Sequence, residues 1–125
     1  MHSLRVAVLA AWTAVLIGCA SDVTRTSAVL APSTATDRQR IELAENTSVR
    51  SSAGYTRHLP GGSVWELRGK LPQGAVYRRL NDIFTIEGAH QHEAYLVVSG
   101  NQLVGYYLPV EQAYSPAEPV TLKLK

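Results

Sequence analysis

The chain is short of several things, and each shortage excludes a class of function. Its one cysteine, Cys19, cannot form an internal disulfide. Twelve lysines and arginines are nearly balanced by ten aspartates and glutamates. The longest basic run is the pair Arg78-Arg79, so we expect no nucleic-acid partner. A length of 125 residues allows one small domain.

Motifs that carry catalysis are also missing. There is no Gly-x-Ser-x-Gly stretch, and no glycine-rich phosphate loop precedes a helical pattern. The carboxylates are scattered, and nothing marks two of them as a catalytic pair. The sequence therefore predicts a protein that is not an enzyme and needs no cofactor.

What the chain does have begins at its N-terminus. His2 and Arg5 form a short positive region, and residues 6–17 are apolar except for Thr13. Gly18 follows as a small residue, which completes the layout of a secretory signal peptide. Twelve helical residues span about 18 Å, against about 30 Å for a bilayer core, so a permanent membrane span is not expected.

Leu16-Ile17-Gly18-Cys19 resembles the lipobox of bacterial lipoproteins. The resemblance implies a diacylglyceryl group on the sulfur of Cys19, cleavage between Gly18 and Cys19, and an acyl chain on the freed amine. Ala20, rather than an aspartate, follows the cysteine, which in that family implies the outer membrane. The alternative is an ordinary secretory signal with an incidental cysteine.

Three regions are expected along the chain: a signal peptide over 1–18, a lipidated cysteine and flexible tether over 19–37, and a small all-β domain over 38–125. The tether is rich in serine, threonine and alanine and has no helical or strand period. As a coil it would span on the order of 25 Å and lift the domain from the membrane.

Short β-branched and aromatic runs follow one another between turn residues after residue 38, with no sustained helical period. This pattern is typical of a small antiparallel sandwich or an SH3-like barrel. The expected strands begin near Arg40 and continue over 63–68, 75–80, 83–87, 93–99, 102–108 and 120–124.

The strongest local pattern is a hairpin over 93–109, with Gly100-Asn101 as a two-residue type II′ turn. A regular register would place Ser99 opposite Gln102, Val97 opposite Val104 and Tyr95 opposite Tyr106. Both faces of this hairpin are apolar, so it is expected to lie centrally, covered on both sides or on one.

Residues 49–109 also resemble bacterial SH3-like domains. The resemblance rests on Val49-Arg50, on the stretch 59–69, and on EAYLVV followed by LVGYYLP. The chain departs from that family by about twenty extra residues after Gly69 and by Tyr95 at a tryptophan position. The resemblance implies barrel architecture, and no binding residue follows from it.

Two groups of residues are candidate sites. His90 and His92 would point to the same side of a strand and could share a metal ion, with His58 or Glu87 as a third ligand; the alternative is ordinary hydrogen bonding in a loop.

The second group comprises Trp65, Tyr77, Arg78 and Arg79, which could bind a protein or glycan partner if exposed. The alternative is that the aromatic residues fill the core.

These features together predict an outer-membrane lipoprotein that is anchored through Cys19, faces the periplasm, and binds or braces an envelope protein or the cell wall. The alternatives are a periplasmic metal-binding module built on His90 and His92, and an inhibitor or sensor of cell-wall enzymes.

Overall fold

The computed structural model describes residues 21–34, 36 and 38–125. None of these residues is helical, and the expected all-β fold of short antiparallel strands is confirmed. The strands are β1 (Thr26–Ser27), β2 (Ala31–Pro32), β3 (Arg40–Glu42), β4 (Thr47–Arg50), β5 (Thr56–Leu59), β6 (Val64–Leu71), β7 (Gly74–Arg79), β8 (Thr85–Glu87), β9 (Gln91–Glu93), β10 (Tyr95–Ser99), β11 (Gln102–Leu108) and β12 (Ala113–Thr121).

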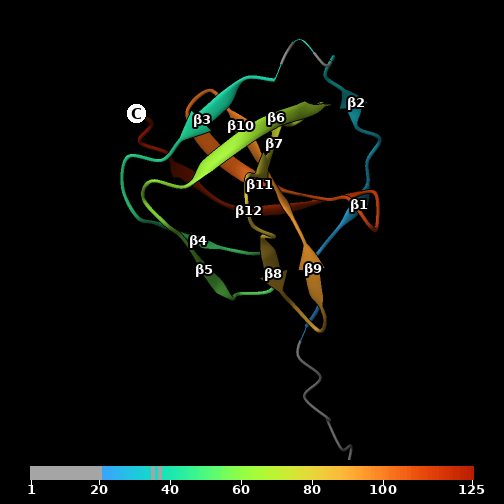
Figure 1. The fold of residues 1–125 in the computed structure, drawn as a ribbon. Helices are drawn as coiled ribbons and strands as arrows, with labels where there is room; N and C mark the ends of the chain where they lie inside the picture. The colour runs from blue at the N-terminus through green and yellow to red at the C-terminus, as the bar shows by residue number, and fades with distance from the viewer. Residues whose placement is uncertain (1–20, 35, 37) are drawn as a thin grey trace, which may run out of the picture.

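One curled antiparallel sheet, half of a barrel, organises the molecule (Figure 1). Its strand order is β1-β12-β11-β10-β7-β6-β2. Strand β2 pairs with Gly69 and Lys70 of β6, whereas β3 pairs with residues 64–66 of the same strand. Two separate hairpins, β4–β5 and β8–β9, lie beside this sheet. No helix among the described residues is long and apolar enough to cross a membrane.

The central hairpin is formed by β10 and β11, as predicted, and its turn has the expected geometry. Gly100 has a φ of 63°, the positive value that a type II′ turn requires at its first central position. Ser99 pairs with Gln102, also as predicted.

Beyond the turn the predicted register is wrong. A bulge beside Val97 and Val98 places Val97 opposite Gly105 instead of Val104, and Tyr95 opposite Tyr107 instead of Tyr106. A bulge inserts one extra residue on one strand, and side chains alternate along a strand, so every later residue of β11 changes face.

The last strand also differs from its prediction. β12 begins at Ala113 and includes Pro116 and Pro119, whereas the sequence pattern favoured 120–124. Proline is tolerated here because β12 lies near the sheet edge, where β1 pairs only with its first two residues.

The main core fills one face of the sheet and is covered by the two hairpins. Trp65, Tyr106 and Leu96 come from the sheet, whereas Val49 and Ile86 come from the hairpins, and all five are at most 1% exposed. The bulge explains why Tyr106, rather than Tyr107, points into this core.

A smaller apolar cluster occupies the opposite face, with Val76, Val97 and Tyr107 at its centre. Ala28 and Leu30, from the segment that joins β1 to β2, pack against it. Both faces of the central hairpin are therefore covered, which is one of the two arrangements that its apolar pattern allowed.

The expected flexible tether over 19–37 needs correction. Val23 is buried in the main core, β1 pairs with β12, and β2 pairs with β6. The segment thus runs from one edge strand of the sheet to the other (Figure 1). The folded domain thus includes residues well before residue 38, because Val23, β1 and β2 exchange water for buried apolar contacts and backbone pairing.

Candidate functional site

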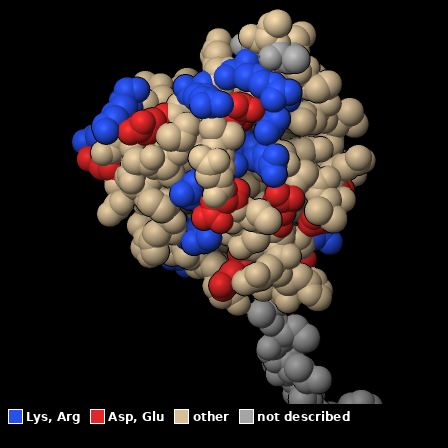
Figure 2. Space-filling view, in the orientation of Figure 1, with Lys and Arg blue, Asp and Glu red and all other residues tan. Residues whose placement is uncertain are grey.

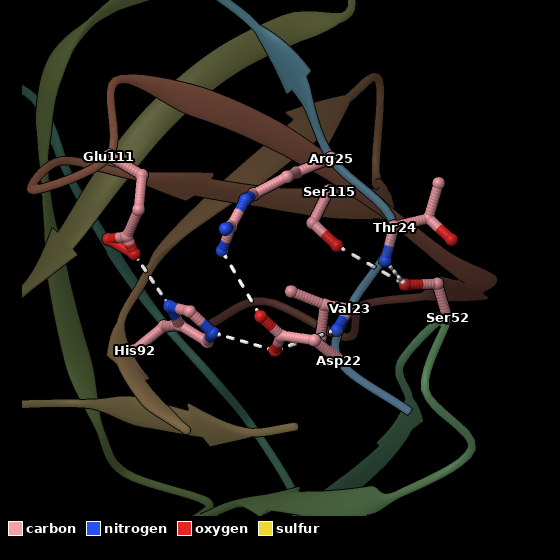
Figure 3. A network of polar contacts seen from close by, with 8 residues as sticks. All are labelled: Asp22, Val23, Thr24, Arg25, Ser52, His92, Glu111 and Ser115. Atoms are coloured by element: carbon pink, nitrogen blue, oxygen red, sulfur yellow. Dashed lines mark hydrogen bonds and ion pairs between the residues drawn. The ribbon is translucent and has the colours of Figure 1, made fainter. Parts of the chain in front are cut away.

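The chain joins the folded domain beside a buried histidine. His92, on β9, lies between two carboxylates: its Nε2 is 2.9 Å from Oδ1 of Asp22, and its Nδ1 is 2.6 Å from Oε2 of Glu111 (Figure 3). His92 is only 6% exposed. A neutral imidazole has one N–H, so both bonds to carboxylates are made only by the protonated ring, which donates from both nitrogens.

The contacts shift two pKa values in opposite directions. Burial lowers the pKa of His92, but the hydrogen bonds to Asp22 and Glu111 outweigh burial, so the pKa lies above the ordinary 6.5. The hydrogen bond from His92 lowers the pKa of Asp22 below the ordinary 3.8, against a smaller opposing effect of burial. Each side of the contact thus favours the charged form of the other.

Local structure explains why these groups meet. His92 lies opposite Ile86 in the β8–β9 register, and because Ile86 points into the core, the imidazole does too. Glu111 lies in the turn between β11 and β12. Gly88, in the β8–β9 turn, leaves room for the carboxylate of Asp22, since a Cβ at this position would collide with Oδ1.

Further bonds hold the residues after Asp22. The same carboxylate accepts a bond from the backbone N–H of Val23 at 2.9 Å and contacts Nη1 of Arg25 at 3.3 Å. The backbone N–H of Thr24 donates to Oγ of Ser52 at 2.8 Å, and that oxygen lies 3.4 Å from Oγ of Ser115 (Figure 3). Residues 22–24 are therefore bonded directly to two other parts of the fold, β9 through His92 and the segment after β4 through Ser52.

We call Asp22, His92 and Glu111 the histidine clamp. Carboxylates occupy both nitrogens of His92, so the ring has no open position from which to take a proton from a nucleophile. Charge-assisted hydrogen bonds each contribute about 1.5–3 kcal/mol to stability. The histidine clamp therefore attaches the N-terminal segment to β9 and to the turn between β11 and β12.

The predicted pairing of His90 with His92 at a metal is not what the fold provides. His90 is exposed in the turn after β8, whereas His92 is buried and uses both nitrogens. His58 and Glu87, the suggested third ligands, line a separate hollow. Within residues 21–34, 36 and 38–125, no three histidine, cysteine, aspartate or glutamate side chains form a metal-binding group.

That hollow, of about 300 Å³, lies between the two hairpins. Arg57 spans it: Nε donates to the carbonyl oxygen of Thr85 at 2.7 Å, and the guanidinium lies 4.8 Å from the ring centre of Phe84. His58 Nδ1 is 2.8 Å from Oγ of Ser48. Both members of this pair are exposed, and in the described structure no carboxylate contacts the histidine to orient it as a base.

The four predicted partner-binding residues do not form one surface. Trp65 is 0% exposed, its Nε1 donates to Oγ of Ser63 at 2.9 Å, and its ring meets Phe84 edge-on, so the prediction is wrong for this residue. Tyr77 packs against the same core, and Arg79 lies over the Trp65 ring at 5.7 Å. Arg78 points to the other face, as alternation along β7 requires.

Arg78 lies instead beside a cluster of arginines around Glu66. This glutamate is only 5% exposed, and three guanidinium groups surround it: Arg40 at 3.3 Å, Arg68 at 3.5 Å and Arg38 at 3.8 Å. Arg78 is its cross-strand neighbour. One carboxylate cannot neutralise so many cations, so this arginine cluster carries surplus positive charge.

The arginine cluster lies away from the start of the folded domain. Arg40 begins β3, which lies at the opposite end of the molecule from residue 21 (Figure 1). Figure 2 shows several lysine and arginine side chains at the upper end of this view with acidic side chains among them, and side chains of both signs lower down. The arginine cluster and Asp22 thus lie toward opposite ends of the domain.

The predicted lipidation and cleavage residues, Cys19 and Gly18, lie outside the described residues. Sequence reasoning missed Asp22 and Glu111, which are 70 and 19 residues from His92 along the chain. It also missed Glu66, whose signal was an acidic residue between the apolar residues Trp65 and Leu67. We found no protein-family model, curated protein or solved structure that matches this chain.

Proposed function

We propose that this protein is a bacterial envelope lipoprotein. Cys19 carries the lipid that holds the protein in the outer membrane, the β domain faces the periplasm, and its role is to bind or brace another envelope component without catalysis. The single observation that carries the proposal is the position of the only cysteine, directly after an apolar run and Leu16-Ile17-Gly18.

The histidine clamp supports the proposal. Asp22 follows Cys19 by three residues and is held by His92, Val23 is buried in the core, and both lie in a rigid β fold. A lipid on Cys19 would therefore hold the whole domain at the membrane. Its two or three acyl chains suffice for stable attachment, at about 0.8 kcal/mol per buried methylene.

A non-catalytic role is supported by how the polar groups are used. Carboxylates occupy both nitrogens of His92, Arg57 is bonded to the backbone, and Glu66 is surrounded by arginines. Each of these groups therefore has its polar partners within the fold. The arginine cluster retains surplus charge, and it is the surface that we assign to an anionic envelope partner such as the carboxylates of the cell wall.

The proposal is tested by mass spectrometry of the protein purified from bacterial membranes, with Cys19→Ser as control. We expect a mature chain that begins at Cys19 and carries diacylglyceryl and acyl groups, and that fractionates with the outer membrane. The Cys19→Ser variant should keep its signal segment and gain no lipid. A wild-type chain with a free thiol, or one cut elsewhere, contradicts the proposal.

A further inference from the structure

The length of chain between the lipid and the folded domain limits where that domain can lie. Cys19 and Asp22 are three residues apart, and three residues span at most about 10 Å even when fully extended. This distance is much shorter than the reach of the tether expected from sequence. If Cys19 carries lipid, as the proposed function requires, Asp22 lies close to the lipid headgroups.

Asp22 cannot swing away from the domain to relieve this restriction. Its carboxylate is bonded to His92, Val23 is buried in the main core, and the N–H of Thr24 is bonded to Ser52. A rigid body held by such a short connection presents one face to the membrane. That face is the one that surrounds Asp22.

Two turns adjoin residues 22–24 and define this face. The β8–β9 turn contacts Asp22 through Gly88 and continues with the exposed residues Ala89 and His90. The segment after β4 bonds through Ser52 to the backbone of Thr24, two residues after Asp22, and continues to Tyr55, which is 39% exposed. Tyrosine is favoured at membrane interfaces because its ring is apolar and its hydroxyl is polar.

We propose that the face formed by residues 52–55 and 88–90 lies against the headgroups of the membrane that holds the Cys19 lipid, so that the arginine cluster points away from this membrane. In Figure 1, the β8–β9 turn lies at the end of the molecule where the grey segment begins, and β3 lies at the other end. The basic surface is then directed across the periplasm, where an anionic partner would meet it.

The orientation is tested with a fluorophore attached to a single introduced cysteine. The chain has no other cysteine, and a lipidated Cys19 has no free thiol. Ala89→Cys places the dye on the proposed membrane face, and Gln39→Cys places it directly before β3. The lipidated variants are reconstituted into phosphatidylethanolamine–phosphatidylglycerol vesicles that contain a headgroup-linked quencher.

We expect quenching several times stronger at position 89 than at position 39. Inserting a flexible glycine–serine spacer of about 15 residues after Ser21 should remove the difference, since such a spacer allows the domain to tumble. Equal quenching at both positions, in protein that mass spectrometry shows to be lipidated, overturns the orientation and leaves the proposed function standing. Absence of lipid in wild-type protein overturns both.

Discussion

Single residues in the main core show where the packing leaves a polar group unsatisfied. Tyr106 is 0% exposed, and no group in the described structure lies within hydrogen-bond distance of its hydroxyl. Burial raises the pKa of this hydroxyl far above its usual value, so it stays neutral. Its ring packs against Phe84 with 6.0 Å between the centres, which is the useful contribution of the side chain.

We therefore expect Tyr106→Phe to stabilise the protein by about 1 kcal/mol, because it removes a buried hydroxyl without a partner and keeps the ring. Urea unfolding measures the change. Tyr55→Phe is the matched control, since the Tyr55 side chain is exposed and its substitution should change stability by less than about 0.5 kcal/mol. A loss of stability in Tyr106→Phe would show that the hydroxyl has a partner.

At the scale of elements, the histidine clamp joins the N-terminal segment to β9 and to the β11–β12 turn. The pKa of His92 is raised in the folded state, so its contribution to stability is fully present below pH 6.5 and is lost as pH rises through the folded value. The pKa of Asp22 is lowered, so its contribution is present above pH 3.8 and is lost as pH falls through its folded value.

We therefore expect His92→Gln to be less stable than wild type by about 2–3 kcal/mol at pH 5.5, with a smaller difference at pH 9. Urea unfolding at a series of pH values measures it. His90→Gln, which alters an exposed histidine two residues away, should follow the wild-type profile. A difference between His92→Gln and wild type that is constant from pH 5.5 to 9 would mean that the clamp does not depend on the charge of His92.

Which elements could be predicted from sequence depends on how far each pattern extends. The β10–β11 hairpin was predictable because long apolar runs flank Gly100-Asn101, but nothing in Val97-Val98 marks the bulge that changes its register. β1 and β2 have only two residues each, too few for any period to show. Their pairing is decided by distant strands, which local composition does not report.

The site was less predictable than the fold, for a related reason. The pattern His90-x-His92 included the histidine of the clamp but paired it with the wrong residue. A turn precedes β9, and His90 in this turn is exposed, away from the buried His92. Asp22 and Glu111 are ordinary carboxylates in the sequence and gain their role only when the sheet brings them to His92.

At the scale of the whole molecule, acidic and basic side chains are interspersed over the face drawn in Figure 2, with several basic ones at its upper end. The arginine cluster presents positive charge to solvent, because Arg38 and Arg40 are more than half exposed while the glutamate that they share is buried. An anionic partner would meet guanidinium groups already held in place by Glu66. Such contacts weaken as salt is added.

We expect the double variant Arg38→Ser, Arg40→Ser to reduce co-sedimentation of the protein with purified cell-wall sacculi, and added salt to have the same effect on wild type. The control is Lys123→Ser, Lys125→Ser, which removes the same charge from side chains that are also more than half exposed. Equal loss in both double variants would indicate a response to net charge alone, and no loss in either would exclude the arginine cluster as the cell-wall surface.

The pairing of β1 with β12 also determines when the fold can close. A polypeptide delivered N-terminus first presents Thr26 and Ser27 long before Tyr114 and Ala113, their strand partners, have arrived. His92 and Glu111 also follow late in the chain, so under the proposed function Asp22 would have no clamp until they arrive. If Cys19 is processed as the proposed function requires, it would emerge on an open polypeptide, and the attachment of the N-terminal segment would close only when the last strand is present.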